Sequence, residues 1–354
     1  MNRRKLTFIG ACFYYSGLVK LVTWWTQLSG QHLIILNYHF ASLGDLRSHV
    51  LYLRRHYRIL HLDAALEELT AQRKGQERTR DRRTPLVLTF DDGYRDNYTH
   101  AFALAQELQV PITIFLIPYY IESGNYFWWL KGRLLVQQAQ VDKASIDERT
   151  YHLYEQEERE ALAHAIYTRM LFTSSVAERE AFLASVSAAL KAPASPVSED
   201  EASLPLTWTQ VLEMARNEYV SFGAHTIHHP VLSYLADPDE IRREVRECRT
   251  VLEQKLGYPV NSFAYPLGKL EHIGDAGVCA VQEAGYAWAL TTVPGLNTAK
   301  CNPYLLRRIP IDITQHWTVT AAETCGVWGF FSRLLDSFNA KASSKSVHKK
   351  STGI

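Results

Sequence analysis

The sequence predicts one α/β domain in which a mostly parallel, seven-stranded sheet curls into a barrel. Short apolar segments alternate along the chain with amphipathic helical ones, which is the pattern of a parallel sheet covered by helices. Polar residues with catalytic potential directly follow several of these segments, as they do at the carboxyl edge of a barrel. The predicted strands lie near residues 33, 86, 112, 219, 262, 286 and 306.

Composition sets broad limits on the protein. Its 354 residues are 47% hydrophobic, which suits one large α/β domain or one domain with an insertion. The formal net charge of +1 gives no electrostatic reason to expect a nucleic-acid partner. The five cysteines are scattered and form no C-x-x-C pair. This argues against a disulfide framework or a thiolate metal site, and it suits a reducing compartment.

The N-terminal segment is predicted to be an apolar or amphipathic helix. A basic start at residues 3–5 precedes an apolar, aromatic-rich run over residues 6–28, which Lys20 interrupts. A spanning helix needs about 20 apolar residues without such a break, whereas tryptophan beside basic residues suits the membrane interface. An interfacial or docked helix therefore ranks first, an uncleaved anchor second and a cleaved signal last. We expect a membrane-associated protein rather than a freely soluble cytoplasmic one.

Helices are expected between the predicted strands. Apolar residues at helical spacing predict two helices within residues 44–71, one near residues 98–108 and one over residues 237–256. Residues 72–84 are polar and charged, which predicts a linker.

The predicted strand that begins at Leu86 ends at two aspartates and a glycine, Asp91, Asp92 and Gly93. Adjacent carboxylates repel each other and lose water at a buried strand end, and a divalent cation is the usual compensation. The glycine lets the backbone turn, so that the two carboxylates can reach different partners. Taken alone, the segment is equally well explained as an acidic turn.

A histidine cluster follows another predicted strand, at residues 219–223. His225, His228 and His229 fall within five positions, and imidazole with carboxylate is the ligand mixture of a catalytic zinc or related transition-metal site. His225 can converge with either of the other two on one helical face, so the spacing does not decide between them. A polar loop is the alternative interpretation.

Together, the segments Thr89–Gly93 (TFDDG) and His225–Pro230 (HTIHHP) resemble the motifs of the polysaccharide deacetylase family, the NodB-homology domain of carbohydrate esterase family 4. The segment Pro111–Phe115 (PITIF) fits the family as well. The resemblance covers roughly residues 31–313 and includes a large insertion. It implies a distorted (β/α)7 barrel, which agrees with the seven predicted strands.

The resemblance also implies roles for the motif residues. Asp91 would be the catalytic base. Asp92, His225 and His229 would bind a divalent metal, with zinc the expected ion, and His228 would be a bystander.

His39 follows the first predicted strand, which begins at Leu33. An apolar run with a polar tip indicates chemistry at the carboxyl end of a buried strand, although a structural histidine at the edge of the core would show the same pattern. The late histidine motif that supplies the catalytic acid in many family members has no counterpart near the C-terminus. Leu36–His39 (LNYH) resembles a circularly permuted, exopolysaccharide-type branch with this histidine on the first strand. The resemblance thus implies that His39 is the general acid.

The segment Phe263–Gly268 (FAYPLG) matches the family's third motif only in part. Ala264 stands where the family usually has an arginine that orients and charge-pairs the base. Arg308, at another predicted strand, is our candidate replacement, whereas Arg307 is expected on the surface. By resemblance, the backbone N–H of Leu267 would help to stabilise the oxyanion. The family's fourth motif is not recognisable in the chain.

Residues 155–190 are rich in Ala, Glu, Leu and Arg with helical periodicity, which predicts a helical insertion rather than a second catalytic domain. The aromatic residues 127–129 open it. They could wall a sugar site, but anchoring of the insertion to the barrel is the preferred interpretation. The predicted organisation is an N-terminal helix over 1–30, a barrel over 31–122 and 206–315, the insertion over 123–205, a C-terminal helix over 316–340 and a flexible basic tail over 341–354.

We therefore expect a metal-dependent hydrolase that removes the N-acetyl group from an N-acetylated sugar of a glycan or polysaccharide. A non-catalytic carbohydrate-binding or scaffolding protein on the same fold is the alternative, which the alanine at position 264 favours and the complete ligand set disfavours. A second enzymatic alternative keeps the site but acts on a lipid-linked glycan or on peptidoglycan.

Overall fold

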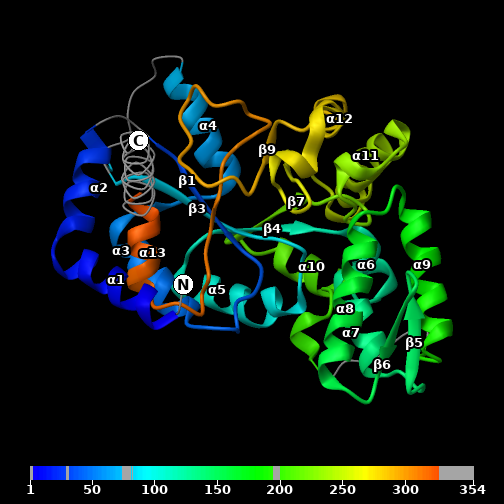
Figure 1. Ribbon diagram of the computed structural model, residues 1–354. Helices are drawn as coiled ribbons and strands as arrows, with labels where there is room; N and C mark the ends of the chain where they lie inside the picture. The colour runs from blue at the N-terminus through cyan, green and yellow to red at the C-terminus, as the bar shows by residue number, and fades with distance from the viewer. Residues whose placement is uncertain (1–2, 29–31, 74–80, 82, 194–199, 327–354) are drawn as a thin grey trace, which may run out of the picture.

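The computed structural model describes residues 3–28, 32–73, 81, 83–193 and 200–326. Its centre is a curled parallel sheet with helices packed around it (Figure 1). The strand order across the sheet is β10 (Ile309–Pro310), β1 (Ile34–Tyr38), β3 (Pro85–Phe90), β4 (Ile112–Leu116), β7 (Val220–Ala224), β8 (Ser262–Ala264) and β9 (Trp288–Leu290). All neighbouring pairs in this order are parallel. A short strand, β2 (Arg58–Ile59), pairs with β3 outside this order.

One short segment links the two edges of the curled sheet. Leu306 forms a parallel bridge to Leu290 of β9, and three residues later Ile309 pairs with Leu36 of β1. The segment therefore contacts both outer strands and draws the sheet into a barrel. The distorted seven-stranded α/β barrel predicted from the sequence is confirmed.

The central strands are apolar on both faces for a simple reason. Every residue of β1, β3 and β4 is buried, because helices cover the outside of the sheet and side chains fill its inside. Continuous apolar runs rather than alternating ones are therefore the sequence pattern of these strands.

The helices of the barrel lie close to the predicted positions. They are α3 (Leu46–His56), α4 (Leu62–Arg73), the π-helix η1 (Asn97–Phe102) continuing into α5 (Ala103–Leu108), α6 (Pro118–Ser123), α10 (Trp208–Ala215), α11 (Pro238–Leu256) and α12 (Leu270–Glu283). Short 3-10 turns, η2 (Glu201–Ser203) and η3 (Leu232–Tyr234), complete the connections. The helix predicted near residue 98 thus begins as a π-helix, a form that is frequent at functional sites.

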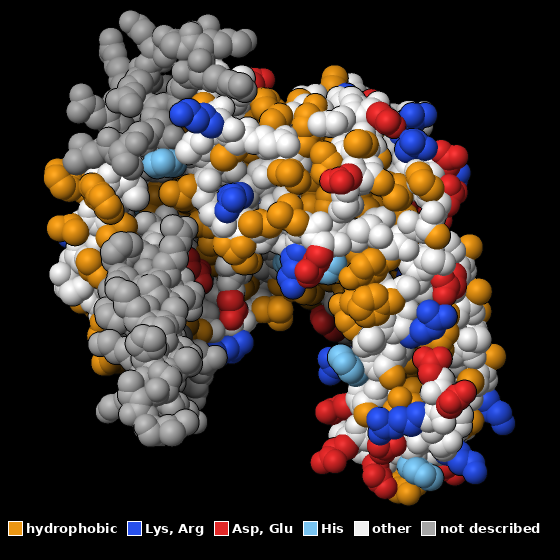
Figure 2. Space-filling view, turned by 45° about the horizontal axis from the view of Figure 1, so that its top comes forward, with side chains coloured by type: hydrophobic (Ala, Val, Ile, Leu, Met, Phe, Trp, Pro, Cys, Tyr) orange, Lys and Arg blue, Asp and Glu red, His pale blue; other side chains and the backbone are white. Residues whose placement is uncertain are grey.

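The insertion packs as a lobe beside the barrel and projects from the rest of the molecule (Figure 2). It contains α7 (Trp128–Gln137), α8 (Gln156–Leu171) and α9 (Val176–Ala189) around a hydrophobic cluster of its own. It also contains an antiparallel hairpin, β5 (Lys143–Ile146) and β6 (Arg149–His152), which the prediction of a purely helical insertion missed. Its turn residues Asp147 and Glu148 have φ values of 48° and 66° without a glycine, so the usual hairpin signal is absent from the sequence.

The N-terminal segment forms two helices rather than one, α1 (Arg3–Tyr15) and α2 (Leu18–Leu28), which bend by 69° where Gly17 adopts a φ of 79°. No single helix in the described part of the chain has the length and apolarity to cross a membrane, and α1 and α2 meet that test only as a bent pair. Helix α1 packs against α13 (Trp317–Thr324). Helix α13 is the described part of the predicted C-terminal helix. Helix α13 ends at Thr324, and residues 327–340 of the predicted helix and the predicted basic tail lie outside the described residues.

Candidate active site

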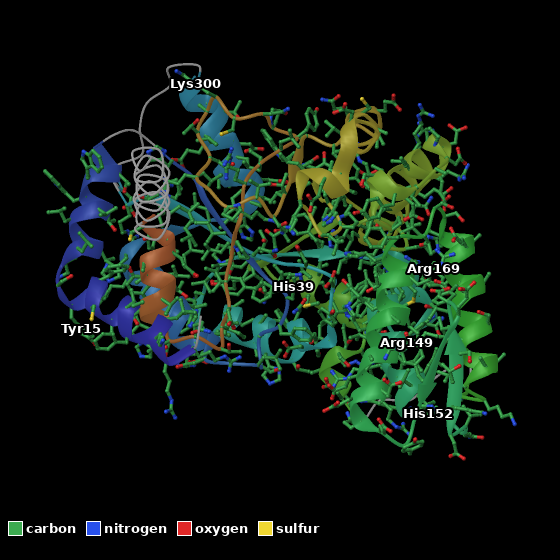
Figure 3. The ribbon with its side chains drawn as sticks, in the orientation of Figure 1. Tyr15, His39, Arg149, His152, Arg169 and Lys300 are labelled. Atoms are coloured by element: carbon green, nitrogen blue, oxygen red, sulfur yellow. The ribbon has the colours of Figure 1, made fainter. Side chains whose placement is uncertain are left out.

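The residues proposed for chemistry meet at the carboxyl ends of the barrel strands. Asp91 and Asp92 follow β3, His39 follows β1, and His225 and His229 follow β7. Figure 3 labels His39 near the middle of the molecule, close to these strand ends. The side chains share one cavity of about 340 Å³. Its lining residues are His39, Asp91, Asp92, Tyr94, Trp128, Trp129, Tyr167, His225, His229, Leu267 and Thr292.

Three of these residues form a buried cluster with the donor set of a metal site. The Nε2 atoms of His225 and His229 lie 3.4 and 3.6 Å from Oδ1 of Asp92, and one ligand atom from each residue lies within 4.8 Å of the others. Nδ1 of His225 donates to the carbonyl of Ala264 at 2.6 Å, which fixes the tautomer and leaves Nε2 free to bind an ion. One carboxylate and two imidazoles fit a transition metal, with room for a further ligand.

The structure decides between the two histidines that spacing left open. His228 turns away from the cluster, and its Nδ1 lies 2.6 Å from Oε1 of Glu244. The backbone N–H of His228 also donates to the Glu244 carboxylate at 2.9 Å. His229, not His228, faces Asp92.

The backbone adopts conformations that are uncommon outside glycine at Asp92 and in the ligand loop, which comprises residues 225–230. Asp92, Thr226 and His229 have φ values of 72°, 62° and 56°, and such residues persist only where their surroundings hold them. The hydroxyl of Thr226 contributes by accepting from the His229 N–H at 2.9 Å and donating to the His225 carbonyl at 2.6 Å. Our assignment of roles missed this contact of Thr226, although the residue stands within the HTIHHP motif.

Asp91 is held by a buried arginine. The Nη1 and Nη2 atoms of Arg308 donate to the two Asp91 carboxylate oxygens at 2.7 and 2.8 Å. Arg308 is fully buried and also donates from Nε to the carbonyl of Thr291 at 2.9 Å. Burial alone would raise the pKa of Asp91, but the facing guanidinium more than offsets it and holds this pKa below its ordinary value. The neighbouring Arg307 is exposed.

The pKa values of the ligand cluster reflect burial and close charges. Burial would raise the pKa of Asp92, but its contact with His225 and the nearby imidazoles lower it to about 2. Burial and the adjacent His225 lower the pKa of His229 to about 3. Burial would lower the pKa of His225, but the two neighbouring carboxylates raise it above the usual value. Asp92 as carboxylate and His229 as neutral imidazole are in the protonation states that metal ligands need.

His39 is exposed at the mouth of the cavity, and its backbone is fixed by the segment after the aspartates. The Asn97 side-chain amide donates to the carbonyl of His39 at 2.9 Å. The carboxylate of Asp96 accepts from the backbone N–H groups of Ala41 and Ser42. Asp96 and Asn97 are therefore positioning residues that sequence reasoning missed, because their partners are backbone atoms of a distant loop.

Leu267 lies on the cavity with a φ of 58°. Its carbonyl accepts from the hydroxyl of Thr292 at 2.7 Å, which fixes the turn that carries its N–H. Among the described residues, no acceptor pairs with that N–H. The geometry is compatible with the predicted oxyanion contact, which stays a prediction.

Aromatic rings from the insertion wall one side of the cavity. Trp128, Trp129 and Tyr167 contribute to the lining, and the Trp129 indole N–H donates to the Tyr94 hydroxyl at 2.8 Å. Phe127 is fully buried and stacks on Trp129 with ring centroids 4.7 Å apart. The aromatic run thus both anchors the insertion and lines the cavity, so the two interpretations of residues 127–129 are not exclusive.

The family model described as "Polysaccharide deacetylase" matches residues 78–288, which is more than half of the chain. The chain belongs to the polysaccharide deacetylase family. Members of this family act on N-acetylated polysaccharides and are generally metal-dependent.

Individual relatives are distant. YxkH of Bacillus subtilis, which is named for the same family, is 22% identical over 282 residues, or 78% of this chain and 71% of that protein. Among solved structures, the deacetylase PplD of Streptococcus pyogenes in complex with acetate is 18% identical, with 83% of this chain and 98% of that chain covered and a TM-score of 0.52. IcaB from Ammonifex degensii is 16% identical, with 84% and 98% covered and the same TM-score. At such identities these structures show a shared fold.

The ligand assignment predicts different outcomes for the two adjacent histidines. His229→Ala removes one of three ligands and should weaken zinc affinity by more than the roughly 10- to 100-fold typical of an outer-shell change. His228→Asn keeps a donor for Glu244 and should leave the affinity near that of the wild type. Titration of metal-free protein against a chromophoric zinc chelator measures both. Equal losses in the two variants would contradict the assignment.

Proposed function

We propose that this deacetylase-family protein is a metal-dependent hydrolase that removes the N-acetyl group from an N-acetylated sugar in a glycan or polysaccharide. The observation that carries the proposal is the convergence of Asp92, His225 and His229 in one cavity with the buried pair of Asp91 and Arg308. The aromatic rings along the same cavity suit the apolar face of a pyranose ring.

Zinc is the ion that we propose for the cluster, on the strength of its mixed nitrogen and oxygen donors. When bound, it would polarise the acetyl carbonyl and lower the pKa of a water molecule in the open position. Asp91, kept ionised by Arg308, accepts the proton as water attacks the amide carbon. The N–H of Leu267 donates to the developing oxyanion. His39, at the cavity mouth, donates a proton to the departing amine nitrogen.

The non-catalytic alternative loses its main support in this arrangement. It was favoured by Ala264, which leaves the base without the usual arginine. Arg308 makes a two-pronged contact with Asp91 from another segment of the barrel, so the charge pair is present. A complete set of ligands, base and candidate acid favours an enzyme over a scaffold.

The first test of the proposed activity is acetate release from N-acetylglucosamine oligomers and from a panel of N-acetylated glycans, with Asp91→Asn as the variant. Asn cannot accept the proton, so turnover should fall by about 10²- to 10⁴-fold. The ligand cluster is untouched, and bound zinc measured by atomic emission should stay at the wild-type level. Full activity in this variant would refute the assignment of the base, and no acetate from any glycan would refute the function.

The second test concerns the arginine that holds the base. In Arg308→Met, burial of Asp91 is no longer offset by a cation, so its pKa should rise and the acid limb of the pH–rate profile should move to higher pH. Activity is then lost first on the acidic side, because the base must be deprotonated to act. Arg307→Met alters the exposed neighbour and should leave the profile in place. An unchanged profile in Arg308→Met would exclude Arg308 from this role.

We also propose that the N-terminal helices rest on an anionic membrane surface. One side of the helix pair is docked, since Tyr14 packs on Trp317 with ring centroids 4.7 Å apart and Gly10 abuts the backbone of α13. Five other large apolar side chains of the pair are 61–75% exposed: Phe8, Tyr15, Leu21, Trp24 and Trp25. Residues 3–28 contain basic but no acidic side chains. Exposed aromatic rings beside cations match the interfacial region of anionic lipids.

Vesicle sedimentation tests this surface. The wild type should bind vesicles that contain phosphatidylserine more tightly than vesicles of phosphatidylcholine alone, and salt should weaken the binding. Trp24→Ser combined with Trp25→Ser should lower affinity by about tenfold or more, as expected from the loss of two buried aromatic side chains. Leu270→Ser, which changes an exposed apolar residue of the barrel, is the control. Absence of wild-type binding, or equal binding by the double variant, would refute the proposal.

A further inference from the structure

Two side chains of the insertion donate hydrogen bonds to the backbone of the ligand loop (residues 225–230), at two consecutive residues. The indole N–H of Trp128, on α7, donates to the carbonyl of His229 at 2.9 Å. Nη2 of Arg179, on α9, donates to the carbonyl of His228 at 3.2 Å. Both side chains are almost completely buried, with 1% and 2% of their surface exposed. The contacts therefore lie inside the interface between the insertion and the barrel.

The two side chains also support each other. The guanidinium carbon of Arg179 lies 5.3 Å from the centroid of the Trp128 ring, and Nε of Arg179 donates to the Glu180 carboxylate at 3.3 Å. A buried arginine is costly unless its charge and its N–H groups are compensated. Here the compensation comes from an aromatic face, a carboxylate and the carbonyl of the ligand loop.

The two ligand histidines differ in how their rings are held. His225 has the usual outer partner, the carbonyl of Ala264 on its Nδ1. Nδ1 of His229 is buried and has no hydrogen-bond partner among the described residues. An imidazole without such a partner depends on its backbone and on ring packing for its orientation. The His229 backbone has a left-handed φ of 56°, and the centroids of the Trp129 and His229 rings lie 4.6 Å apart.

We propose that the insertion is a positioning element of the metal site, in which Trp128 and Arg179 hold the backbone of the ligand loop so that His229 faces Asp92 and His225. The barrel holds the other side of the same loop through the bonds of Glu244 to His228. The ligand geometry is thus set jointly by the barrel and by a segment outside it. This inference rests on the metal site of the proposed function.

The experiment compares two tryptophan variants of the full-length chain. Trp128→Phe keeps an aromatic ring beside Arg179 and removes the donor to the His229 carbonyl. Its zinc affinity, measured by competition with a chromophoric chelator, should fall by about tenfold, as for other outer-shell partners. Trp129→Phe keeps an aromatic ring against His229 and removes an indole donor whose acceptor is the Tyr94 hydroxyl, so its zinc affinity should stay within about threefold of the wild type.

Arg179→Met provides a second variant, which tests the other carbonyl contact if Trp128→Phe does not fold. It should weaken zinc binding as well. The melting temperature of each metal-free variant separates a loss of stability from a loss of positioning, because a purely structural role would lower this temperature without changing the zinc affinity of the folded protein.

Two results would overturn the inference in different ways. If folded Trp128→Phe and Arg179→Met bind zinc as tightly as the wild type, the insertion does not position the ligand loop, and the proposed hydrolase stands. If the wild type itself binds no divalent ion, the metal site fails, and the proposed function and this inference fail together.

Discussion

The site depends on the burial of two adjacent carboxylates at the end of one strand. Asp91 and Asp92 are 2% and 5% exposed, and an uncompensated charge at such depth is costly. The protein compensates them separately. Arg308 pairs with Asp91, whereas two imidazoles face Asp92. The left-handed φ at Asp92 turns the second carboxylate away from the first, and this division gives the two neighbouring carboxylates different partners.

The arginine that compensates the buried charge of Asp91 also links the site to closure of the barrel. Arg308 belongs to the short segment that bridges β9 at Leu306 and pairs with β1 at Ile309. A sheet that failed to close would therefore also leave Asp91 without its cation. Ala264 is small and fully buried, and its carbonyl orients His225. An arginine at position 264 would place a second guanidinium in the same interior, so the alanine there and the arginine at 308 form one consistent arrangement.

The sequence predicted the parts of the protein that follow from local composition. Apolar runs located the strands, and polar residues after them located Asp91, Asp92 and the histidine loop. Spacing left His228 and His229 open, and only the family resemblance favoured His229. The partner that turns His228 away, Glu244, lies on a helix 16 residues further along the chain and carries no local signal. The hairpin of the insertion was missed because Asp147 and Glu148 form its turn without glycine. The roles of Asp96, Asn97 and Trp128 were not predictable, since their acceptors or donors are backbone atoms that any sequence supplies.

The insertion contacts the site in two ways, and Trp128 combines them. Its ring lines the cavity where a substrate would lie, and its N–H holds the carbonyl of the adjacent ligand, His229. A shift of this ring to accommodate a different sugar would lengthen or break the bond to the loop and disturb the ligand geometry. Trp129, whose N–H binds Tyr94 instead, can change without breaking a bond to the loop as long as an aromatic ring stays against His229. On this physical basis, variation in substrate preference should be easier at position 129 than at position 128, although the two rings are neighbours on one helix.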